Sequence, residues 1–244
     1  SQVTHSMGVE DTRQILNGAY FKVNAESLTI VSCDSFKLAK CIRNIALENR
    51  SAPDRVFDYK FIVPTKTVNE LMKLLDDGEE QTVTVFVTRR FIVFIIEGIT
   101  FFSRLVDGEY IDYNRIIVTD HKIRATLPRA ALISSLERAA LVTEERIAGS
   151  VRANVKLEFS GPVLKISTSS SAGATYDELP IDHEGEDILI AFNNRYLIDS
   201  VRACDGDEIC LSLSSPLTSM NIEPVTQPEN TDEIFMLLPV RMKE

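Results

Sequence analysis

An internal repeat constrains the fold of this chain more than any other feature. Residues 62–87 predict an apolar strand, a short helix, an acidic turn at Asp77-Gly78 and an alternating strand, and the stretch from Ile190 follows the same plan. The apolar face of the first predicted helix contains Val68, Leu71, Met72 and Leu75.

The two predicted helices share charges as well as apolar positions. Burial dictates where the apolar residues of a helix lie, but it does not dictate the positions of charges. The chain is therefore interpreted as a duplicated module. A shift of 129 positions places Arg195 on Lys66, Leu197 on Val68, Asp199 on Glu70, Val201 on Met72, Arg202 on Lys73 and Asp205 on Asp76.

A second pair of matching segments precedes the two helices. The stretch GAYFKVNAESLTIVSCDSFKLAKCI predicts a strand, a turn and a strand, and VRANVKLEFSGPVLKISTSS predicts the same order. Here the shift is 136, which places Leu164 on Leu28 and Ile166 on Ile30. The difference of seven between the two shifts requires an insertion in a loop, and the candidate loops are 45–58 and 169–185.

The duplication divides the 244 residues into modules of about 120 residues each. We place the boundary near residue 117, giving modules 1–117 and 118–244. A helix is predicted after Pro128, and its counterpart in the first copy would lie almost wholly before Ser1, so the first module is expected to be truncated at its N-terminus. The predicted inner stripe of this helix is Ala131, Leu132, Ser135, Leu136, Ala139 and Ala140.

Composition limits the classes of function. With 26 basic and 36 acidic residues the formal net charge is −10, which argues against a protein that finds nucleic acid by bulk attraction but permits a local basic surface. The longest apolar run, residues 91–96, is far shorter than the ~20 residues of a membrane-spanning helix. The four cysteines have no CxxC spacing and are expected to be buried thiols in a reducing compartment.

Catalytic motifs are scarce. The three histidines, His5, His121 and His183, lie in polar sequence segments that are typical of loops. No spacing of cysteines or carboxylates around them predicts a metal site. The run Asp182-His183-Glu184 could form acid/base machinery, but a solvated loop after a strand is the favoured interpretation, because nothing nearby supplies a nucleophile or an oxyanion site. The sequence predicts no cofactor, since it contains no GxSxG, P-loop or GxGxxG motif.

The cations of the repeat helices are more informative. Lys66 and Lys73 are seven residues apart, as are Arg195 and Arg202, so each pair lies on one helix face two turns apart. For one helix alone, a solvated face explains this spacing. Because the spacing recurs in both copies of an acidic protein, we expect equivalent helices to face an extended anion.

Five ordered motifs resemble one family along the whole chain. They are DTRQILNG (11–18), LTIVSCDSFKLA (28–39), FSRLVDGEYIDYNRII (102–117), IAFNNRYLID (190–199) and FMLLPVRM (235–242). The chain resembles the β subunit of bacterial DNA polymerase III, the sliding clamp family, and its modules match the middle and last of that family's three. The resemblance implies an internally duplicated α+β fold, with two helices packed on antiparallel sheets in each module. It also implies a non-catalytic processivity factor that acts in the bacterial cytoplasm at the nucleoid.

The resemblance also implies partners and roles for individual residues. The family closes two full-length chains into a homodimeric ring around duplex DNA. A peptide groove between the middle and last modules receives the DNA polymerase III alpha subunit, the clamp-loader delta subunit and other proteins with clamp-binding motifs. On the middle-module side the matching residues are Leu16, Phe36, Lys37, Leu38, Ile111, Arg115 and Ile116. On the last-module side they are Asn193, Tyr196, Leu217, Ser219, Met236, Leu237, Leu238, Pro239, Val240 and Arg241.

Two further sets of residues follow from the resemblance. Leu141 and Val142 match the last-module side of the ring interface, although an apolar pair at a helix end is also typical of a core. The residues expected to face DNA are Arg13, Lys66, Lys73, Arg195 and Arg202.

The chain departs from the family pattern at two places. Many clamps have Asp-Gly-His-Arg-Leu where this chain has DSFKL at 34–38, and Phe-Pro-Asp-Tyr where it has YIDY at 110–113.

Two rival functions remain open from the sequence. A two-module scaffold could bind peptides through the apolar C-terminal stretch and never contact DNA. A hydrolase could use Asp182 and His183. The terminal strand itself, residues 234–238 closed by Pro239, is also typical of an ordinary edge strand that completes a sheet.

Overall fold

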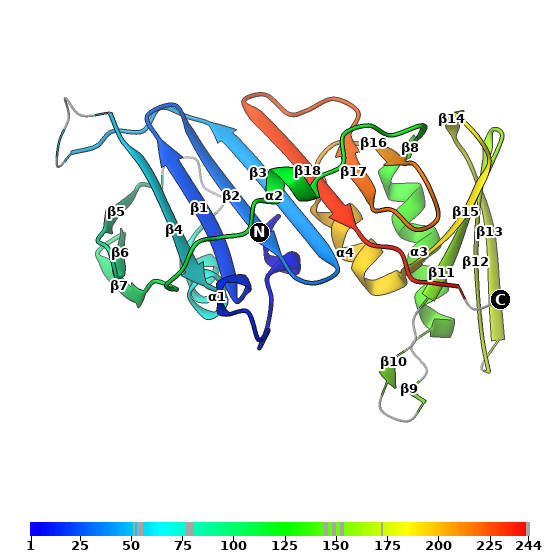
Figure 1. Cartoon of the computed structure of the whole chain (residues 1–244), viewed down its shortest axis with the longest axis horizontal. Helices are drawn as coiled ribbons and strands as arrows, with labels where there is room; N and C mark the ends of the chain where they lie inside the picture. The colour runs from blue at the N-terminus through cyan, green and yellow to red at the C-terminus, as the bar shows by residue number, and fades with distance from the viewer. Residues whose placement is uncertain are drawn as a thin grey trace. The chain divides into compact units, whose positions relative to one another are not determined.

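The computed structural model of the chain describes residues 1–50, 52, 56–76, 81–143, 146–147, 150–151, 154–171 and 173–242. The chain divides into two compact units (Figure 1). Unit 1 consists of Ser1–Tyr113 with Asn230–Asp232, and unit 2 of Asn114–Glu229 with Glu233–Glu244, so the division falls a few residues before position 117. The turn predicted at Asp77-Gly78 lies outside the described residues.

Unit 1 contains two antiparallel sheets and one principal helix. The strand orders are β3-β2-β1-β4 and β5-β6-β7. The helix α1 (Thr65–Leu74) follows β4 directly, and a short helix, α2 (Tyr113–Ile116), begins at the end of the unit. The other elements are η1 (Thr4–Ser6), η2 (Gln14–Leu16), β1 (Gly18–Asn24), β2 (Ser27–Cys33), β3 (Lys37–Asn44), β4 (Asp58–Pro64), β5 (Val83–Val87), β6 (Phe91–Ile96) and β7 (Ile99–Arg104).

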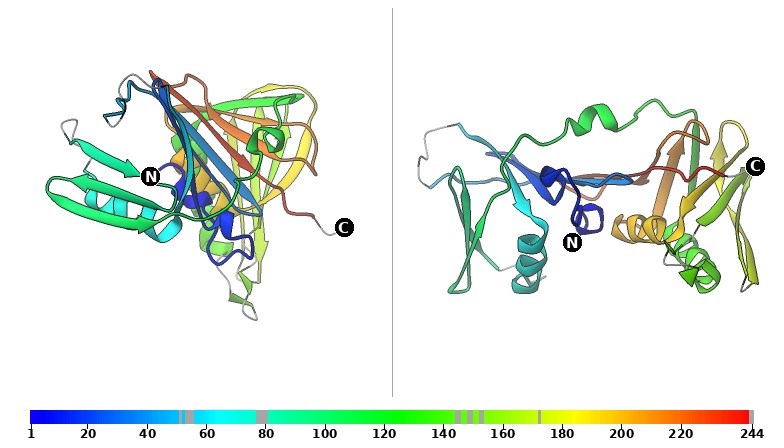
Figure 2. Two further views of the ribbon diagram at one scale, coloured as in Figure 1. Left: turned by 60° about the vertical axis from the view of Figure 1, so that its left-hand side comes forward. Right: turned by 60° about the horizontal axis from the view of Figure 1, so that its bottom comes forward.

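Unit 2 repeats this arrangement with an additional helix. Its strand orders are β13-β12-β11-β15 and β14-β8-β16-β17-β18, and β9 pairs with β10. The helices are α3 (Arg129–Thr143) and α4 (Asn194–Ala203), which pack against each other (Figure 2, right). The strands are β8 (Ile123–Pro128), β9 (Arg146–Ile147), β10 (Ser150–Val151), β11 (Asn154–Ser160), β12 (Val163–Ser170), β13 (Gly173–Pro180), β14 (Asp182–Glu184), β15 (Ile188–Asn193), β16 (Glu208–Leu213), β17 (Met220–Pro224) and β18 (Thr231–Leu237).

The structure confirms the internal repeat element by element. Adding 129 to the bounds of α1 gives the bounds of α4, and adding 136 to those of β1 and β3 gives those of β11 and β13. The shift therefore changes after β3 and β13, where residues 45–57 correspond to residues 181–186. The extra residues lie in the first of the two predicted loops, 45–58, because β13 and β14 occupy most of the second.

The core cluster around α1 in unit 1 joins this helix to both sheets, through Ala19 of β1 and Val63 of β4 as well as through β6. Val68 and Leu71 of α1 pack in one cluster with Ile92, Phe94 and Ile96 of β6, which alternate inward along the strand. The prediction that Met72 and Leu75 belong to the buried stripe was wrong, because both side chains are exposed. Leu75 lies just beyond the last residue of α1, where its N–H donates to the Leu71 carbonyl oxygen.

The second copy explains why Met72 is exposed. Its counterpart Val201 is fully buried in α4, which packs against α3. The described residues of unit 1 include no equivalent of α3. The side of α1 that corresponds to the α3-facing side of α4 is therefore not covered by a helix of the described residues. The inner stripe of α3 agrees with the prediction at Leu132, Ser135, Leu136 and Ala139, which are buried, whereas Ala131 and Ala140 are half-buried.

The four cysteines are free thiols and are all buried, in agreement with the sequence analysis. They occupy β2, β3, β16 and the residue after α4. Within the described part of the chain, no helix is long and apolar enough to span a membrane.

One buried side chain fastens the two helices of unit 2 together. Asn194, the first residue of α4, donates from Nδ2 to the Leu136 carbonyl oxygen of α3 at 2.9 Å. We expect Asn194→Ala to lower the free energy of unfolding of unit 2 by about 1–2 kcal/mol, because a buried hydrogen bond and its packing are lost. Urea unfolding measures this change. The neighbouring exposed Arg195→Ala is the control, and equal stability of the two variants would contradict the assignment.

Candidate functional site

The exposed face of α1 carries the two predicted cations of unit 1. Lys66 and Lys73 both point into solvent, and Glu70 lies between them on the same face. Lys73 Nζ lies 2.8 Å from Glu70 Oε1. Such an exposed pair contributes little to stability and can exchange for a stronger anion. The α1 face therefore presents two cations and one carboxylate.

The face of α4 repeats this pattern in unit 2. Arg195 and Arg202 are exposed, with Asp199 between them, and Arg202 Nη2 lies 2.5 Å from Glu137 Oε1 of α3. The helix begins at an Asn193 cap, whose Oδ1 accepts the Tyr196 N–H at 3.3 Å. The recurrence therefore includes the carboxylate as well as the cations.

Helix electrostatics distinguishes the two cations of each pair. Lys73 and Arg202 stand in the last turns of α1 and α4, where a cation stabilises the helix dipole by itself. Lys66 and Arg195 stand in the first turns, where the dipole disfavours a cation, and neither first turn contains an acidic residue. Helix stability therefore does not explain Lys66 and Arg195, and an anionic ligand would.

Arg13 lies in a different setting from the helix cations. Its Nε and Nη2 atoms each lie 3.2 Å from an oxygen of Asp11, and Nη2 donates to Ser35 Oγ at 2.8 Å. The Asp11 carboxylate raises the pKa of Arg13, and the Arg13 guanidinium lowers that of Asp11. The structure thus ties Arg13 to the turn between β2 and β3, while its contact with DNA remains a prediction.

Asp34 shapes that turn, which presents Phe36. Asp34 Oδ1 accepts the backbone N–H groups of Phe36 and Lys37, each at 2.7 Å, and Asp34 Oδ2 pairs with Lys37 Nζ at 2.7 Å. Lys37 is buried, whereas the Phe36 side chain is 54% exposed. Of the residues predicted in this turn, Phe36 is therefore the one that can contact a partner directly.

The remaining predicted groove residues of unit 1 lie beneath or beside this turn. Leu16 of η2 and Leu38 of β3 are fully buried, so they can support a groove floor but expose no surface. Gly108 brings the 107–111 segment against η2: its φ is +126°, and a Cβ atom there would lie 2.8 Å from Ile15 Cγ2. Ile111 follows half-buried, next to Tyr110, whose ring stacks on Tyr20 with centroids 5.0 Å apart.

Arg115 and Ile116 differ from their predicted assignment. The sequence places them on the side of the first module, whereas both belong to unit 2 in the structure. The short helix α2 crosses the division, since Tyr113, its first residue, still belongs to unit 1 and lies 6.0 Å from Tyr20 between ring centroids. Both Arg115 and Ile116 have exposed side chains.

The C-terminal stretch brings the predicted groove residues of unit 2 together. Leu237 pairs with Met220, next to Ser219, and the Val240 N–H donates to the Ala191 carbonyl oxygen at 2.7 Å, two residues before Asn193. Tyr196 and Pro239 are half-buried, whereas Leu217, Leu238 and Arg241 are exposed. Met236, Leu237 and Ser219 are buried, so the expectation of a groove lined by the whole tail needs correction: the accessible tail starts at Leu238.

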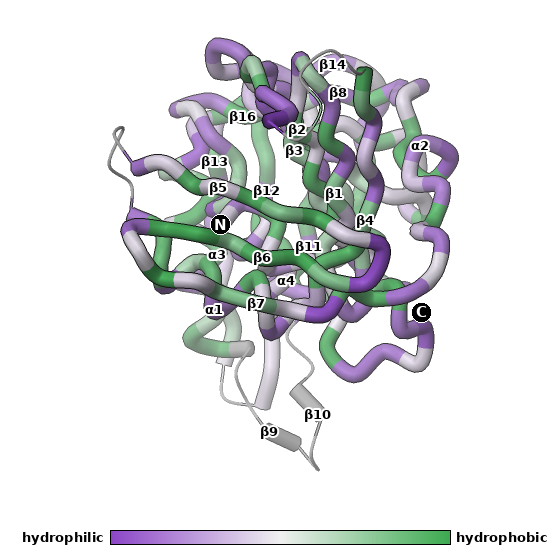
Figure 3. Tube along the Cα trace, turned by 90° about the vertical axis from the view of Figure 1, so that its left-hand side faces the viewer, coloured by the Kyte–Doolittle hydropathy of each residue, from purple (hydrophilic) through white to green (hydrophobic). Residues whose placement is uncertain are grey.

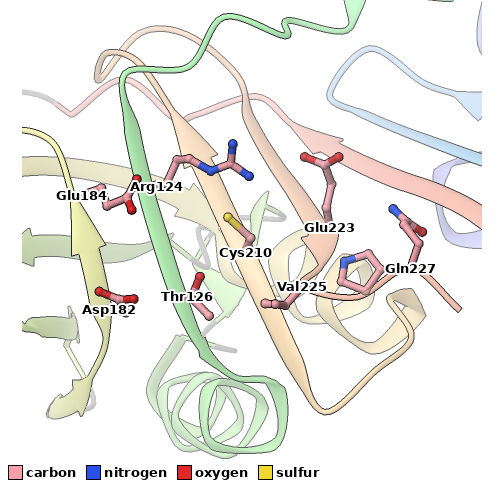
Figure 4. A pocket seen from close by; sticks show the side chains of 9 residues that line it. Arg124, Thr126, Asp182, Glu184, Cys210, Glu223, Val225 and Gln227 are labelled. Atoms are coloured by element: carbon pink, nitrogen blue, oxygen red, sulfur yellow. The ribbon is translucent and has the colours of Figure 1, made fainter.

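The residues of the rival hydrolase do not converge. Asp182 and Glu184 line a cavity of about 270 Å³ on the sheet of unit 2, with Arg124, Cys210 and Glu223 among its other walls (Figure 4). His183 is not part of this lining; its ring lies 6.3 Å from that of Phe159. The expected solvated loop was also wrong, since these residues form β14, in which neighbouring side chains point to opposite faces. Among the described residues, no cluster of histidine, cysteine or carboxylate side chains could hold a metal ion.

Family models cover almost the entire chain. One described as DNA polymerase III beta subunit, central domain, matches residues 1–112, and one described as DNA polymerase III beta subunit, C-terminal domain, matches residues 114–240. The chain belongs to the DNA polymerase III beta subunit family. The order of the two matches agrees with the middle and last modules inferred from the sequence motifs.

Relatives of this chain in the beta subunit family are beta sliding clamps. The chain is 31% identical over 245 residues to that of Streptococcus pneumoniae TIGR4 and 30% identical over 247 residues to that of Bacillus subtilis. It spans 61% of the length of each of these relatives, and 99% and 98% of its own residues are covered.

Solved clamp structures share the fold. The DNA polymerase sliding clamp of Bacillus subtilis matches with a TM-score of 0.86 at 28% identity, covering 99% of this chain and 61% of that one. The clamp of Pseudomonas aeruginosa with ligand gives a TM-score of 0.86 at 24% identity, covering 99% and 62% of the two chains, and supports the fold alone. The α+β clamp fold expected from the sequence is confirmed.

His5 makes the stability of unit 1 depend on pH. It lies in η1, and burial, followed by the nearby Lys37 ammonium, lowers its pKa from 6.5 to about 4. The unfolded chain therefore binds more protons between these values, so stability is full above pH 6.5 and decreases as the pH falls toward 4. In His5→Gln we expect a shallower decrease of the unfolding free energy over this range, measured by urea unfolding. An identical slope in both proteins would contradict the buried, neutral histidine.

Proposed function

We propose that this chain forms the middle and last modules of a sliding clamp, a non-catalytic processivity factor that encircles duplex DNA. The observation that carries the proposal is the recurrence of a first-turn cation at the same phase of α1 and α4, where the helix dipole disfavours it. Two equivalent helices with this feature suit a ligand that repeats its negative charge, as the phosphate backbone does. Membership of the beta subunit family and the named relatives support the same function.

The charge balance supports topological holding of DNA. The exposed faces of α1 and α4 each carry two cations and one carboxylate, and the chain as a whole has a net charge of −10. Tight binding by charge is therefore not the basis of retention. A ring need not bind DNA tightly to stay on it, and a weak basic lining lets it slide.

Partner proteins would dock on the exposed groove residues. We assign Phe36, Leu217, Leu238 and Arg241 to direct contact with the clamp-binding motifs of the DNA polymerase III alpha subunit and the clamp-loader delta subunit. Exposed apolar side chains of this kind suit the leucine and phenylalanine of a short linear motif. The proposed site of action is the bacterial cytoplasm at the nucleoid.

Leu141 suits a contact between chains. It is the most exposed large apolar side chain of α3, with 84% of its area accessible, so the core alternative does not apply to it. Val142 beside it is half-buried. In a full-length clamp this end of α3 would form part of the ring interface of the homodimer.

The first-turn cations give the sharpest test of DNA contact. In a full-length clamp that contains these modules, Lys66→Gln with Arg195→Gln should shorten retention on nicked circular DNA. The slope of affinity against salt should flatten by about two units, one per lost phosphate contact. Lys156→Gln, at an exposed position of β11, is the matched control. An unchanged salt slope would favour the rival peptide scaffold that does not contact DNA.

Peptide binding tests the groove independently of DNA. A peptide with glutamine followed by leucine and phenylalanine should bind with micromolar affinity, because two buried apolar side chains contribute about 2 kcal/mol each before ordering costs. We expect Phe36→Ala and Leu238→Ala each to weaken binding by about tenfold in calorimetry. Leu189→Ala of β15 is the matched control, since Leu189 and Leu238 are both 40% exposed. Equal loss in all three variants, or in none, would refute the assignment.

A further inference from the structure

The outward face of the sheet β5-β6-β7 in unit 1 carries a group of exposed aromatic rings. The strand register places Phe86, Val93 and Phe102 in one row across the three strands. Phe91 lies on the same face, and its ring stacks on that of Phe102 with centroids 5.1 Å apart. Phe86 is 51% exposed, Phe91 is 39% exposed and Phe102 is 59% exposed. We call these three residues the phenylalanine platform.

The core of unit 1 does not require these rings. The opposite face of β6 supplies the core through Ile92, Phe94 and Ile96, which are buried against α1. An antiparallel sheet covered on one side normally carries polar residues on the other. In β6 the outward residues Phe91 and Val93 are apolar as well. Figure 3 looks onto this sheet, with α1 behind it.

The second copy of the module provides an internal comparison. In each unit three antiparallel strands follow the repeat helix, β5 to β7 after α1 and β16 to β18 after α4. In unit 2 the surface over β8, β14, β16 and β17 is polar, with Arg124, Thr126, Asp182, Glu184 and Glu223 around the cavity of Figure 4. The fold therefore tolerates a polar surface here. The three phenylalanines of unit 2, Phe159, Phe192 and Phe235, are all buried, so the described residues of that unit form no such platform. Exposed apolar patches of this kind mark interaction sites.

Arginines flank the phenylalanine platform. Arg89 and Arg90 occupy the turn between β5 and β6, and Arg104 pairs with Phe91 across β6 and β7. All three side chains are exposed, and no described carboxylate forms an ion pair with them. Between residues 81 and 106 the one acidic residue is Glu97, at the opposite end of the sheet between β6 and β7. The platform is therefore locally basic in a chain with a net charge of −10.

We propose that the phenylalanine platform with Arg89, Arg90 and Arg104 binds single-stranded nucleic acid. Every base has a flat face that can stack on an exposed phenylalanine ring, and phosphates pair with arginine, so this combination needs no sequence-specific pocket. The bases of a duplex are already stacked on each other and cannot use the rings. An acidic peptide would meet the same charges, but aromatic faces on three adjacent strands fit stacked bases better.

The platform is separate from the proposed duplex contacts. In unit 1 it lies on the side of the sheet opposite to α1, which carries Lys66 and Lys73. The inference therefore goes beyond the proposed clamp function and does not rest on it. Loss of binding on substitution of Lys66 would indicate the helix, whereas loss on substitution of Phe102 would indicate the platform.

Fluorescence anisotropy with a labelled oligothymidine of about 20 nucleotides tests the proposal at low salt. Phe86→Leu with Phe102→Leu should weaken binding by about tenfold or more, because leucine keeps the apolar surface and removes the stacking faces. Tyrosine at both positions should preserve binding. Arg104→Gln should flatten the salt slope by about 0.7, the value for one phosphate of a single strand.

The controls separate the platform from other sources of binding. Tyr59→Leu removes an aromatic ring of similar exposure from β4, which belongs to the other sheet of unit 1, and should bind like the unsubstituted chain. Lys156→Gln, which removes an exposed cation from β11 of unit 2, should also bind normally. The proposal is overturned if the unsubstituted chain does not bind the single strand, if the leucine variants bind as tightly as it does, or if Lys66→Gln abolishes binding. It is equally overturned if the chain binds a labelled peptide of alternating glutamate and leucine more tightly than it binds the oligothymidine.

Discussion

Burial of one stripe of each repeat helix determines what the opposite stripe presents. A helix of ten residues is marginal in water by itself, so α1 and α4 depend on the elements that cover their apolar sides, which for α4 include α3. Leu197 and Val201 are fully buried in α4, and Val68 and Leu71 are buried in α1. With those faces fixed, the cations seven residues apart must lie together on the exposed face. The proposed DNA contact follows from this packing rather than from any net positive charge.

Much of the fold could be predicted because duplication repeats local information. The two shifts, 129 and 136, place strands and helices of one copy on those of the other, and the extra loop follows from them. The buried stripe of α3 follows instead from the apolar spacing of that helix itself. What the sequence did not predict depends on neighbours. Met72 has the right phase for burial, but the described residues of unit 1 supply no counterpart of α3 to cover it, and His183 belongs to a strand because β8 pairs with residues 182–184.

In the candidate site, too, the sequence motifs predict the segments, whereas the exposure of each residue depends on its neighbours in the fold. Motifs drew attention to the turn at residues 34–38 and to the C-terminal stretch. They could not separate the exposed Phe36 and Leu238 from the buried Leu38 and Met236, because a strand that contributes to a core and a segment that lines a groove are both apolar. The assignment of each residue to direct contact therefore depends on its burial in the fold.

Duplication also exposes where the two modules have diverged. Both keep a helix face with two cations and a carboxylate, which is the shared element of the proposed function. Their outer surfaces differ, since unit 1 carries the phenylalanine platform and unit 2 a polar cavity lined by carboxylates. A helix face that both modules share, with sheet surfaces that differ between them, is expected of modules that share one ligand and differ in their other partners.

The most direct test of the central claim uses the topology of DNA. A full-length clamp containing these modules is loaded onto a nicked circular plasmid, separated from free protein by gel filtration, and the plasmid is then cut once. The account predicts that the clamp remains on the circle at moderate salt and leaves after linearisation, because it slides off the free ends. Equal retention on circular and linear DNA would mean that binding is by contact alone, and it would contradict the ring.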